Sequence, residues 1–174
     1  MEELSEKIQL IKNKLDAYGG TKRAKTKKIE LRGHRGQYIN FNGISDIQTN
    51  GKVNIAETKY IHSSWMTSNF PHVPKERCGP HVAYNDTGLA AGKADSGNFP
   101  MVHSDRPASG NLREELWIML KDEHVIDSIQ FEPRPGCENR LIDAEVIIRT
   151  GDDNAIYSAN IGADYKVVFP PVFV

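Results

Sequence analysis

Residues 115–149 read ELWIMLKDEHVIDSIQFEPRPGCENRLIDAEVIIR, and this stretch decides the fold. It contains three short apolar segments, Glu115–Leu120, Ser128–Pro133 and Ile142–Arg149, that are separated by Gly, Pro, Asp and Asn. Short segments rich in Ile, Val, Leu and Phe between such turn residues are typical of β-strands. The apolar residues do not recur at the period of a helix. The stretch therefore predicts consecutive strands joined by turns.

The same pattern of short apolar segments continues on both sides of this stretch. About eight short strands favour a β-sandwich or jelly roll over a fold in which strands alternate with helices. The segment Thr67–Asn111 departs from the pattern, because it is long, polar and rich in Gly and Pro. A loop region of this length inside a compact domain usually carries function. The further predicted strands are Ile29–Leu31, Gln37–Phe41, Val53–Ala56, Ala155–Ala159 and Lys166–Phe169.

The N-terminal residues Glu2–Ala17 have the apolar period of a helix. Their apolar residues are spaced four, three and four positions apart, which places them on one stripe, and Gly19 and Gly20 end the helix. Two interpretations remain open: the helix docks on its own domain, or it joins copies of the chain through a short coiled-coil seam. The residues of the stripe are Leu4, Ile8, Ile11 and Leu15.

A basic segment, Lys22–Lys28, follows the helix and has no aromatic residue. Basic residues without interleaved aromatic residues favour a solvated linker over a contact with RNA or anionic lipid. The expected organisation is a helix at 1–20, a basic linker at 21–28 and an all-β sandwich at 29–174.

The composition excludes several classes of protein. The chain has 174 residues, 39% hydrophobic and 26% charged, and its 22 basic and 23 acidic residues leave a net charge of −1, which disfavours nucleic acid as a partner. No segment has the ~20 apolar residues that span a bilayer, and the N-terminus lacks the pattern of a secretory signal.

The common motifs of nucleotide-binding, hydrolase and zinc-protease sites are absent, so we do not expect an enzyme. Cys78 and Cys137 form either one disulfide or, as the sequence favours, two separate thiols.

A family resemblance is carried by DSGNFPMVHS at Asp95–Ser104, the strand Glu115–Leu120 and the segment Ile126–Arg134. In this order and spacing they resemble the discoidin or coagulation-factor type C domain and the related family 32 carbohydrate-binding module. The resemblance covers about Val53 to Val174 and implies a galactose-binding-like jelly roll. Weaker matches to the family are Val53–Ala56, Ser63–Trp65, Leu141–Ile148 and Gly151–Tyr157.

The segment Ile29–Phe41 resembles the closing strand of the same family but precedes the rest of the domain. Two interpretations are open: a circular permutation that places the closing strand within residues 29–47, or a remnant of a preceding tandem domain. The permutation is favoured, because this strand would then pair with an otherwise open sheet edge.

The resemblance also implies a structural Ca²⁺ ion. Its oxygen ligands would come from Lys93, Asp95 and Asn98, and Ca²⁺ prefers such carbonyl and carboxylate ligands. The chain departs from the family at Pro100, which replaces a threonine whose hydroxyl is a ligand in many members, and at Val102, which replaces a tryptophan.

The sugar site implied by the resemblance uses His103, Arg134 and Asn139 to contact hydroxyl groups. Each has an ordinary alternative: His103 as a loop histidine, Asn139 as a turn residue, and Arg134 in an ion pair with Glu132, Asp105 or Glu138. A sugar site also needs an aromatic face. We expect Phe99 to supply this face, and the other candidates are Tyr84, Phe70 and Trp65. Arg106 is expected to flank the site, whereas Arg140 can point towards the site or away from it. Trp117 is expected in the core.

The resemblance implies a non-catalytic, lectin-like module that binds terminal galactose-type glycans outside the cell or at its surface. Weak single sites of this kind benefit from avidity, so the N-terminal helix is an expected place for homo-oligomer formation. The alternative is a protein-interaction or structural module of the same fold within a larger surface or virion assembly. Membrane binding, suggested only loosely by Phe70, Met66 and Lys75, is not expected.

Overall fold

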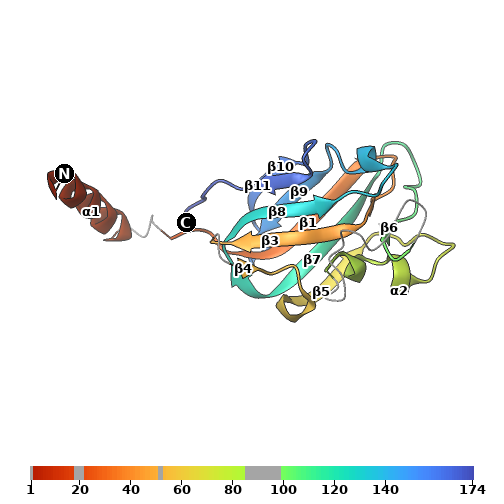
Figure 1. Cartoon of the computed structure of the whole chain (residues 1–174), viewed down its shortest axis with the longest axis horizontal. Helices are drawn as coiled ribbons and strands as arrows, with labels where there is room; N and C mark the ends of the chain where they lie inside the picture. The colour runs from red at the N-terminus through yellow and green to blue at the C-terminus, as the bar shows by residue number, and fades with distance from the viewer. Residues whose placement is uncertain (1, 18–21, 51–52, 85–98) are drawn as a thin grey trace.

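The computed structural model describes residues 2–17, 22–50, 53–84 and 99–174, and these residues form mainly antiparallel β-sheet with an N-terminal helix, α1 (Glu2–Ala17) (Figure 1). Short helical turns interrupt the strands: η1 (Thr58–Tyr60), α2 (Lys75–Cys78), η2 (Pro80–Tyr84) and η3 (Glu138–Arg140). In the described residues, no helix is long and apolar enough to cross a membrane.

Two sheets pack face to face and form an all-β sandwich. A five-stranded sheet has the order β10-β9-β1-β7-β5, and a four-stranded sheet has the order β11-β8-β3-β4. The strands of the first are β1 (Thr26–Arg35), β5 (Ile61–Met66), β7 (Arg113–His124), β9 (Glu145–Arg149) and β10 (Ala155–Asn160). Those of the second are β3 (Gly43–Thr49), β4 (Val53–Asn54), β8 (Ile126–Glu132) and β11 (Lys166–Val168). A separate pair joins β2 (Asn40–Phe41) to β6 (Val102–His103).

The core lies between the two sheets and follows from the alternation of side chains along each strand. On β7, Leu116, Ile118 and Leu120 point inward and are buried, and they meet buried residues of β3 and β8. The rings of Phe41 and Phe131 join the layers edge to edge at 5.9 Å. Each such side chain contributes about 1.5–3 kcal/mol of burial free energy, which makes the sandwich the stable unit of the chain.

The segment predicted around Ile29–Phe41 is an integral part of this sandwich. Its first part, β1, pairs with β7 on one side and with β9 on the other, so it is the central strand of the five-stranded sheet. The preceding basic residues are tied to the C-terminal segment, since Ala24 N donates to Val172 O at 2.6 Å and Val174 N donates to Lys22 O at 2.9 Å.

Each predicted strand overlaps an observed strand, but β3, β5 and β6 were missed. The strand β6 has only two residues, and β3 and β5 were missed for reasons that their pairing and burial show. In β3 the apolar residues Ile44 and Ile47 are three positions apart, because an irregularity in the pairing with β8 lies between Ile44 and Asp46. A strict two-residue alternation is therefore absent from the sequence. In β5, only Ile61 and Met66 are buried at the two ends of a polar edge strand.

The expectation that Trp117 belongs to the core is wrong. Trp117 occupies an outward position on β7 and stacks on Trp65 of β5, with 6.3 Å between ring centroids. The ammonium of Lys28 lies 5.6 Å from the Trp117 ring. The two tryptophans therefore cover the part of the outer face that β5 and β7 form.

The helix α1 lies beyond one end of the sandwich (Figure 1). Its residues Leu4, Ile8 and Ile11 remain 61%, 48% and 58% exposed, so this part of the apolar stripe is not docked on the domain.

Candidate functional site

The candidate site is at the end of the sandwich opposite α1, beside β6 and α2 (Figure 1). Residues 38–41 and 101–104 are joined there by the β2–β6 pair and by Ile39, whose N–H donates to Ser104 Oγ and whose carbonyl accepts from Ser104 N, both at 2.8 Å. We call the side chains gathered at this junction the His103 cluster. Its members are Tyr38, Asn40, Phe70, Phe99, His103, Arg106, Arg134 and Arg140.

His103 lies at the centre of the cluster and is only 5% exposed. Its Nδ1 lies 2.7 Å from the carbonyl oxygen of Ser104, which only accepts, so Nδ1 carries the proton. Burial lowers the pKa of His103 below its usual value, and the nearby Arg134 and Arg140 lower it further, while the Ser104 hydrogen bond and Asp105 act in the opposite direction. The imidazole is therefore neutral near pH 7. Its Nε2 is then an acceptor to which no described residue donates a hydrogen bond.

Three aromatic rings surround the imidazole. The centroid of Phe70 is 4.2 Å from that of His103, the Tyr38 centroid is 5.1 Å away in an edge contact, and the Phe99 centroid is 6.0 Å away. Hydrogen bonds to their backbone atoms hold the two phenylalanines in place: Phe70 N donates to His103 O, and the Arg77 side chain donates through Nη2 to Phe99 O, both at 3.0 Å. Phe70 and Phe99 are half-buried, so each keeps part of its ring accessible.

Asn40 positions two arginines of the cluster. Its Oδ1 accepts hydrogen bonds from Arg134 Nη1 and Arg140 Nη1, both 2.9 Å long. Its amide nitrogen donates to Val102 O at 2.8 Å, which fixes the orientation of this buried side chain. Arg134 follows the end of β8, whereas Arg140 ends η3, which packs beside β2.

Tyr38 positions the cations on the outer side of the cluster. The guanidinium carbons of Arg106 and Arg140 each lie 5.0 Å from the centroid of the Tyr38 ring, a distance at which a cation is attracted to an aromatic face. The side chain of Arg106 is exposed, and the structure gives it no hydrogen bond or ion pair within the described residues.

Four of the five residues expected at a sugar site come together here: His103, Arg134, Phe99 and Arg106. The fifth, Asn139, is exposed on η3, and its neighbour Arg140 makes the contacts to the cluster. Within the described part of the chain, Arg134 forms no ion pair, and its partner is the neutral Asn40. The alternative partners Glu132, Asp105 and Glu138 are not used.

Sequence reasoning missed Tyr38 and Asn40. Both belong to the segment around Ile29–Phe41, which we interpreted only as a strand. A signal was present, because Asn40 is a polar residue between Ile39 and Phe41, and a buried polar side chain at such a place needs partners.

The other expected aromatic and metal-ligating residues lie elsewhere. Tyr84 is buried, and its hydroxyl lies 2.8 Å from Ser64 Oγ, while Trp65 packs on Trp117. The expected calcium ligands Lys93, Asp95 and Asn98 lie outside the described residues. Among the residues that are described, no group of three or more His, Cys, Asp or Glu side chains is placed to hold a metal ion.

Cys78 and Cys137 are separate free thiols. Cys78 is buried at the end of α2, and its sulfur faces the carbonyl oxygens of Phe70, Val73 and Pro74 in the preceding loop at 3.6–3.9 Å. Burial raises the pKa of the Cys78 thiol, so it remains protonated and serves to pack this loop.

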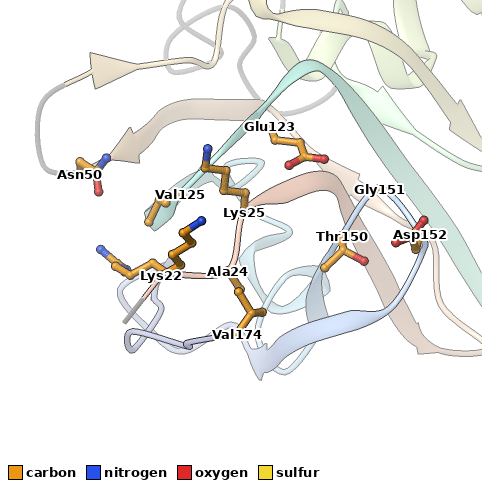
Figure 2. A pocket seen from close by; sticks show the side chains of 11 residues that line it. Lys22, Ala24, Lys25, Asn50, Glu123, Val125, Thr150, Gly151, Asp152 and Val174 are labelled. Atoms are coloured by element: carbon orange, nitrogen blue, oxygen red, sulfur yellow. The ribbon is translucent and has the colours of Figure 1, made fainter. Parts of the chain in front are cut away.

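A cavity of about 740 Å³ is present at the opposite end of the sandwich. Figure 2 shows that its lining comes from separate parts of the chain: Lys22, Ala24 and Lys25 before β1, Glu123 and Val125 around the β7–β8 turn, Thr150 to Asp152 after β9, and Asn50 and Val174. The lining contains no aromatic ring and no histidine. It therefore lacks the stacking face that a sugar site requires.

Comparisons with protein-family models, with curated proteins and with solved structures find no match to this chain.

Proposed function

We propose that the chain is a non-catalytic glycan-binding module that recognises terminal galactose-type sugars at the His103 cluster. The observation that carries the proposal is the junction of a neutral histidine, two oriented arginines and two half-buried phenylalanine rings at one end of a β-sandwich.

The donors and acceptors of the cluster suit sugar hydroxyl groups. In the neutral His103, Nε2 accepts a hydrogen bond from a hydroxyl, whereas the guanidinium groups of Arg134 and Arg140 only donate. A hydroxyl can do both, so vicinal hydroxyls can bridge the two kinds of group. The exposed parts of Phe70 and Phe99 offer an apolar surface to the C–H groups of the ring.

The family resemblance supports the same proposal. It places His103, Arg134 and Asn139 at the sugar in a galactose-binding-like jelly roll of the discoidin and family 32 type. The resemblance also implies an extracellular or cell-surface location and a structural Ca²⁺ ion at Lys93, Asp95 and Asn98. If the ion is present, EDTA should lower the temperature of thermal unfolding, and excess Ca²⁺ should restore it.

Oligomer formation through α1 is a further part of the proposal. Leu4, Ile8 and Ile11 are exposed apolar residues on one stripe, which a second copy of the helix would cover. Joining several weak sites in one particle raises the affinity for a surface that displays many sugars.

A glycan array tests the proposal, with the parent protein and its His103→Ala and Arg134→Ala variants measured with and without Ca²⁺. We expect binding to galactose-terminated glycans that both variants lose. His62→Ala is the matched control, since His62 is exposed on β5 and its Nδ1 lies 3.0 Å from Ser63 Oγ, on a strand that contributes no residue to the cluster. If a folded parent protein binds no glycan, the proposal is wrong. The protein-interaction or structural module would then be the alternative, and a search for a protein partner would follow.

A further inference from the structure

Three guanidinium groups of the His103 cluster have no carboxylate partner among the residues that the structure describes. Arg134 and Arg140 share the single neutral acceptor Asn40 Oδ1, and Arg106 and Arg140 both lie against the Tyr38 ring. In the described ranges, none of the three forms an ion pair. The Nε of Arg134 is also buried without an acceptor there. The cluster therefore concentrates positive charge.

The carboxylates near these arginines are engaged with other groups. Asp105 Oδ1 accepts from the backbone N–H of Arg106 at 2.8 Å, and Glu138 Oε1 accepts from Gly136 N at 3.0 Å. Glu132 Oε1 accepts from Ser45 Oγ at 2.6 Å. The charge of Asp105 raises the pKa of His103, whereas the charges of Arg134 and Arg140 lower it, so Asp105 opposes the effect of the arginines.

Several arginines elsewhere in the sandwich pair with carboxylates, whereas Arg35 and Arg77 donate to backbone carbonyl oxygens. On the outer face of the five-stranded sheet, Glu30 pairs with Arg149 at 3.1 Å and with Arg32 at 3.4 Å. Arg23 pairs with Asp127 at 3.0 Å. Since the chain has a net charge of only −1, carboxylates are available in its composition, and their absence as partners of the three arginines in the described part of the chain is a local feature.

Like charges held close together repel one another, and an anion between them removes this repulsion. A guanidinium presents a planar fork of donors that matches a carboxylate or a sulfate, and hydrogen bonds between charged partners are about twice as strong as neutral ones. An anionic ligand group at Arg106 and Arg140 would thus gain more than a hydroxyl there.

We propose that the His103 cluster selects acidic glycans, in which a galactose-type ring carries a carboxylate or a sulfate ester beside its hydroxyl groups. This proposal rests on the glycan-binding function above. The neutral His103 and the rings of Phe70 and Phe99 contact the uncharged part of the sugar. The anionic group binds to Arg106, Arg134 and Arg140. The half-buried rings favour a compact sugar ring over an extended nucleic acid or a membrane surface.

A matched pair of ligands tests the charge preference. Methyl galactoside and methyl galacturonide have the same ring hydroxyls and differ only at C6, where a hydroxymethyl group is replaced by a carboxylate. Methyl galactoside 6-sulfate is the third ligand, and it carries a sulfate ester at C6. Titration calorimetry of the full chain at low and at high salt gives the ratio of dissociation constants, and phosphatidylserine vesicles serve as a non-sugar anion.

Two charge-removing variants and one matched control accompany the parent protein. Arg106→Gln removes the charge of an exposed side chain that makes no hydrogen bond in the described structure. Arg140→Gln removes the charge of a side chain that donates a hydrogen bond to Asn40 Oδ1. Lys121→Gln removes an exposed charge near the far end of β7, away from the cluster. Thermal unfolding verifies that each variant is folded.

We expect an acidic sugar to bind about tenfold more tightly than the neutral one. This ratio should shrink in Arg106→Gln and Arg140→Gln and at high salt, and stay unchanged in Lys121→Gln. Equal or tighter binding of the neutral galactoside would overturn the acidic preference and leave the glycan-binding function standing. Binding to none of the sugars, with or without binding to the vesicles, would overturn both.

Discussion

Asn40 holds Arg134 beside His103 through a 2.9 Å hydrogen bond from Arg134 Nη1 to Asn40 Oδ1. The two residues are 94 positions apart in the sequence, and Asn40 faces His103 across the β2–β6 pair. The same oxygen accepts from Arg140, so one buried amide sets the positions of two cations relative to one imidazole. The geometry of the site therefore depends on a residue that itself need not touch a ligand.

Replacing Asn40 by alanine should weaken binding and destabilise the fold together. Two guanidinium groups and the Val102 carbonyl would lose their partner, and leaving buried polar groups unsatisfied costs about 1–3 kcal/mol. Chemical denaturation measures the stability, and titration with a galactose-type glycan measures the affinity. Asn160→Ala, an exposed position on β10, is the control. An Asn40→Ala protein with full affinity would show that this amide does not position the site.

The family resemblance and the structure differ on which of two adjacent residues, Asn139 or Arg140, contributes more to glycan affinity. The resemblance assigns a sugar contact to Asn139, whereas the structure places Arg140 against Asn40 and Tyr38. We expect Arg140→Ala to reduce glycan affinity about tenfold or more, and Asn139→Ala to have a much smaller effect. A parallel titration of the two variants decides between the assignments. A larger loss in Asn139→Ala would mean that the ligand reaches η3 from its exposed side.

Protonation of His103 should make the fold less stable in mild acid. Because the pKa of His103 is lower in the folded chain than in the unfolded chain, the unfolded chain binds more protons as the pH falls below about 6.5. Stability contributed by this group is thus present above that pH and decreases towards the lowered pKa. Denaturation curves from pH 7.5 to 5 should show a weaker dependence in His103→Gln than in the parent, whereas His62→Gln should behave like the parent. Identical slopes for His103→Gln and the parent would refute this cause.

Gly36 fixes the turn that leads from β1 to Tyr38. Its φ is +72°, and a Cβ at this position would lie 2.9 Å from the Cα of Gly110, which is backbone and cannot swing away. Gly36→Ala should therefore lower the free energy of unfolding by about 2 kcal/mol or more. Gly162→Ala, where the nearest atom to the new Cβ is 3.7 Å away, is the matched substitution. Equal stability of the two variants would contradict the close approach of Gly36 and Gly110.

The exposed stripe of α1 predicts self-association. Light scattering during size-exclusion chromatography should give a mass above that of one chain for the parent, and the mass of one chain for an Ile8→Ser, Ile11→Ser double variant. Both residues are about half exposed, at 48% and 58%, so the double variant should keep the stability of the sandwich. A monomeric parent at high concentration would contradict self-association through α1 and the avidity expected from it.

Much of the fold was predictable because it depends on the spacing of apolar residues within short segments of the sequence. The alternation on β7 and β8 and the period of α1 gave those elements from the sequence. The central place of β1 was not predictable, since pairing between residues such as Ile29 and Ile118 depends on contacts far apart in the chain. The irregular pairing in β3 and the outward Trp117 depend in the same way on the neighbouring strands.

The membership of the His103 cluster was predicted in part for a related reason. His103, Arg134, Phe99 and Arg106 were expected and do come together, but the loop that brings Phe70 to His103 and the strand that brings Asn40 have no local signature of their role. The lack of carboxylate partners for three arginines within the described residues can be recognised only in the folded chain, because the sequence around Arg106 and Arg140 offers acidic neighbours at Asp105 and Glu138.

The most direct test of the central claim is the ¹⁵N spectrum of the His103 imidazole during titration with methyl galacturonide and methyl galactoside. In the free protein near pH 7, we expect a neutral ring with the proton on Nδ1 and an unprotonated Nε2. Sugar binding should shift the Nε2 resonance, in proportion to saturation, as this nitrogen accepts a hydroxyl hydrogen bond, while the resonances of His62 stay fixed. An Nε2 resonance that does not move at saturating concentrations of either sugar would contradict glycan binding at the His103 cluster.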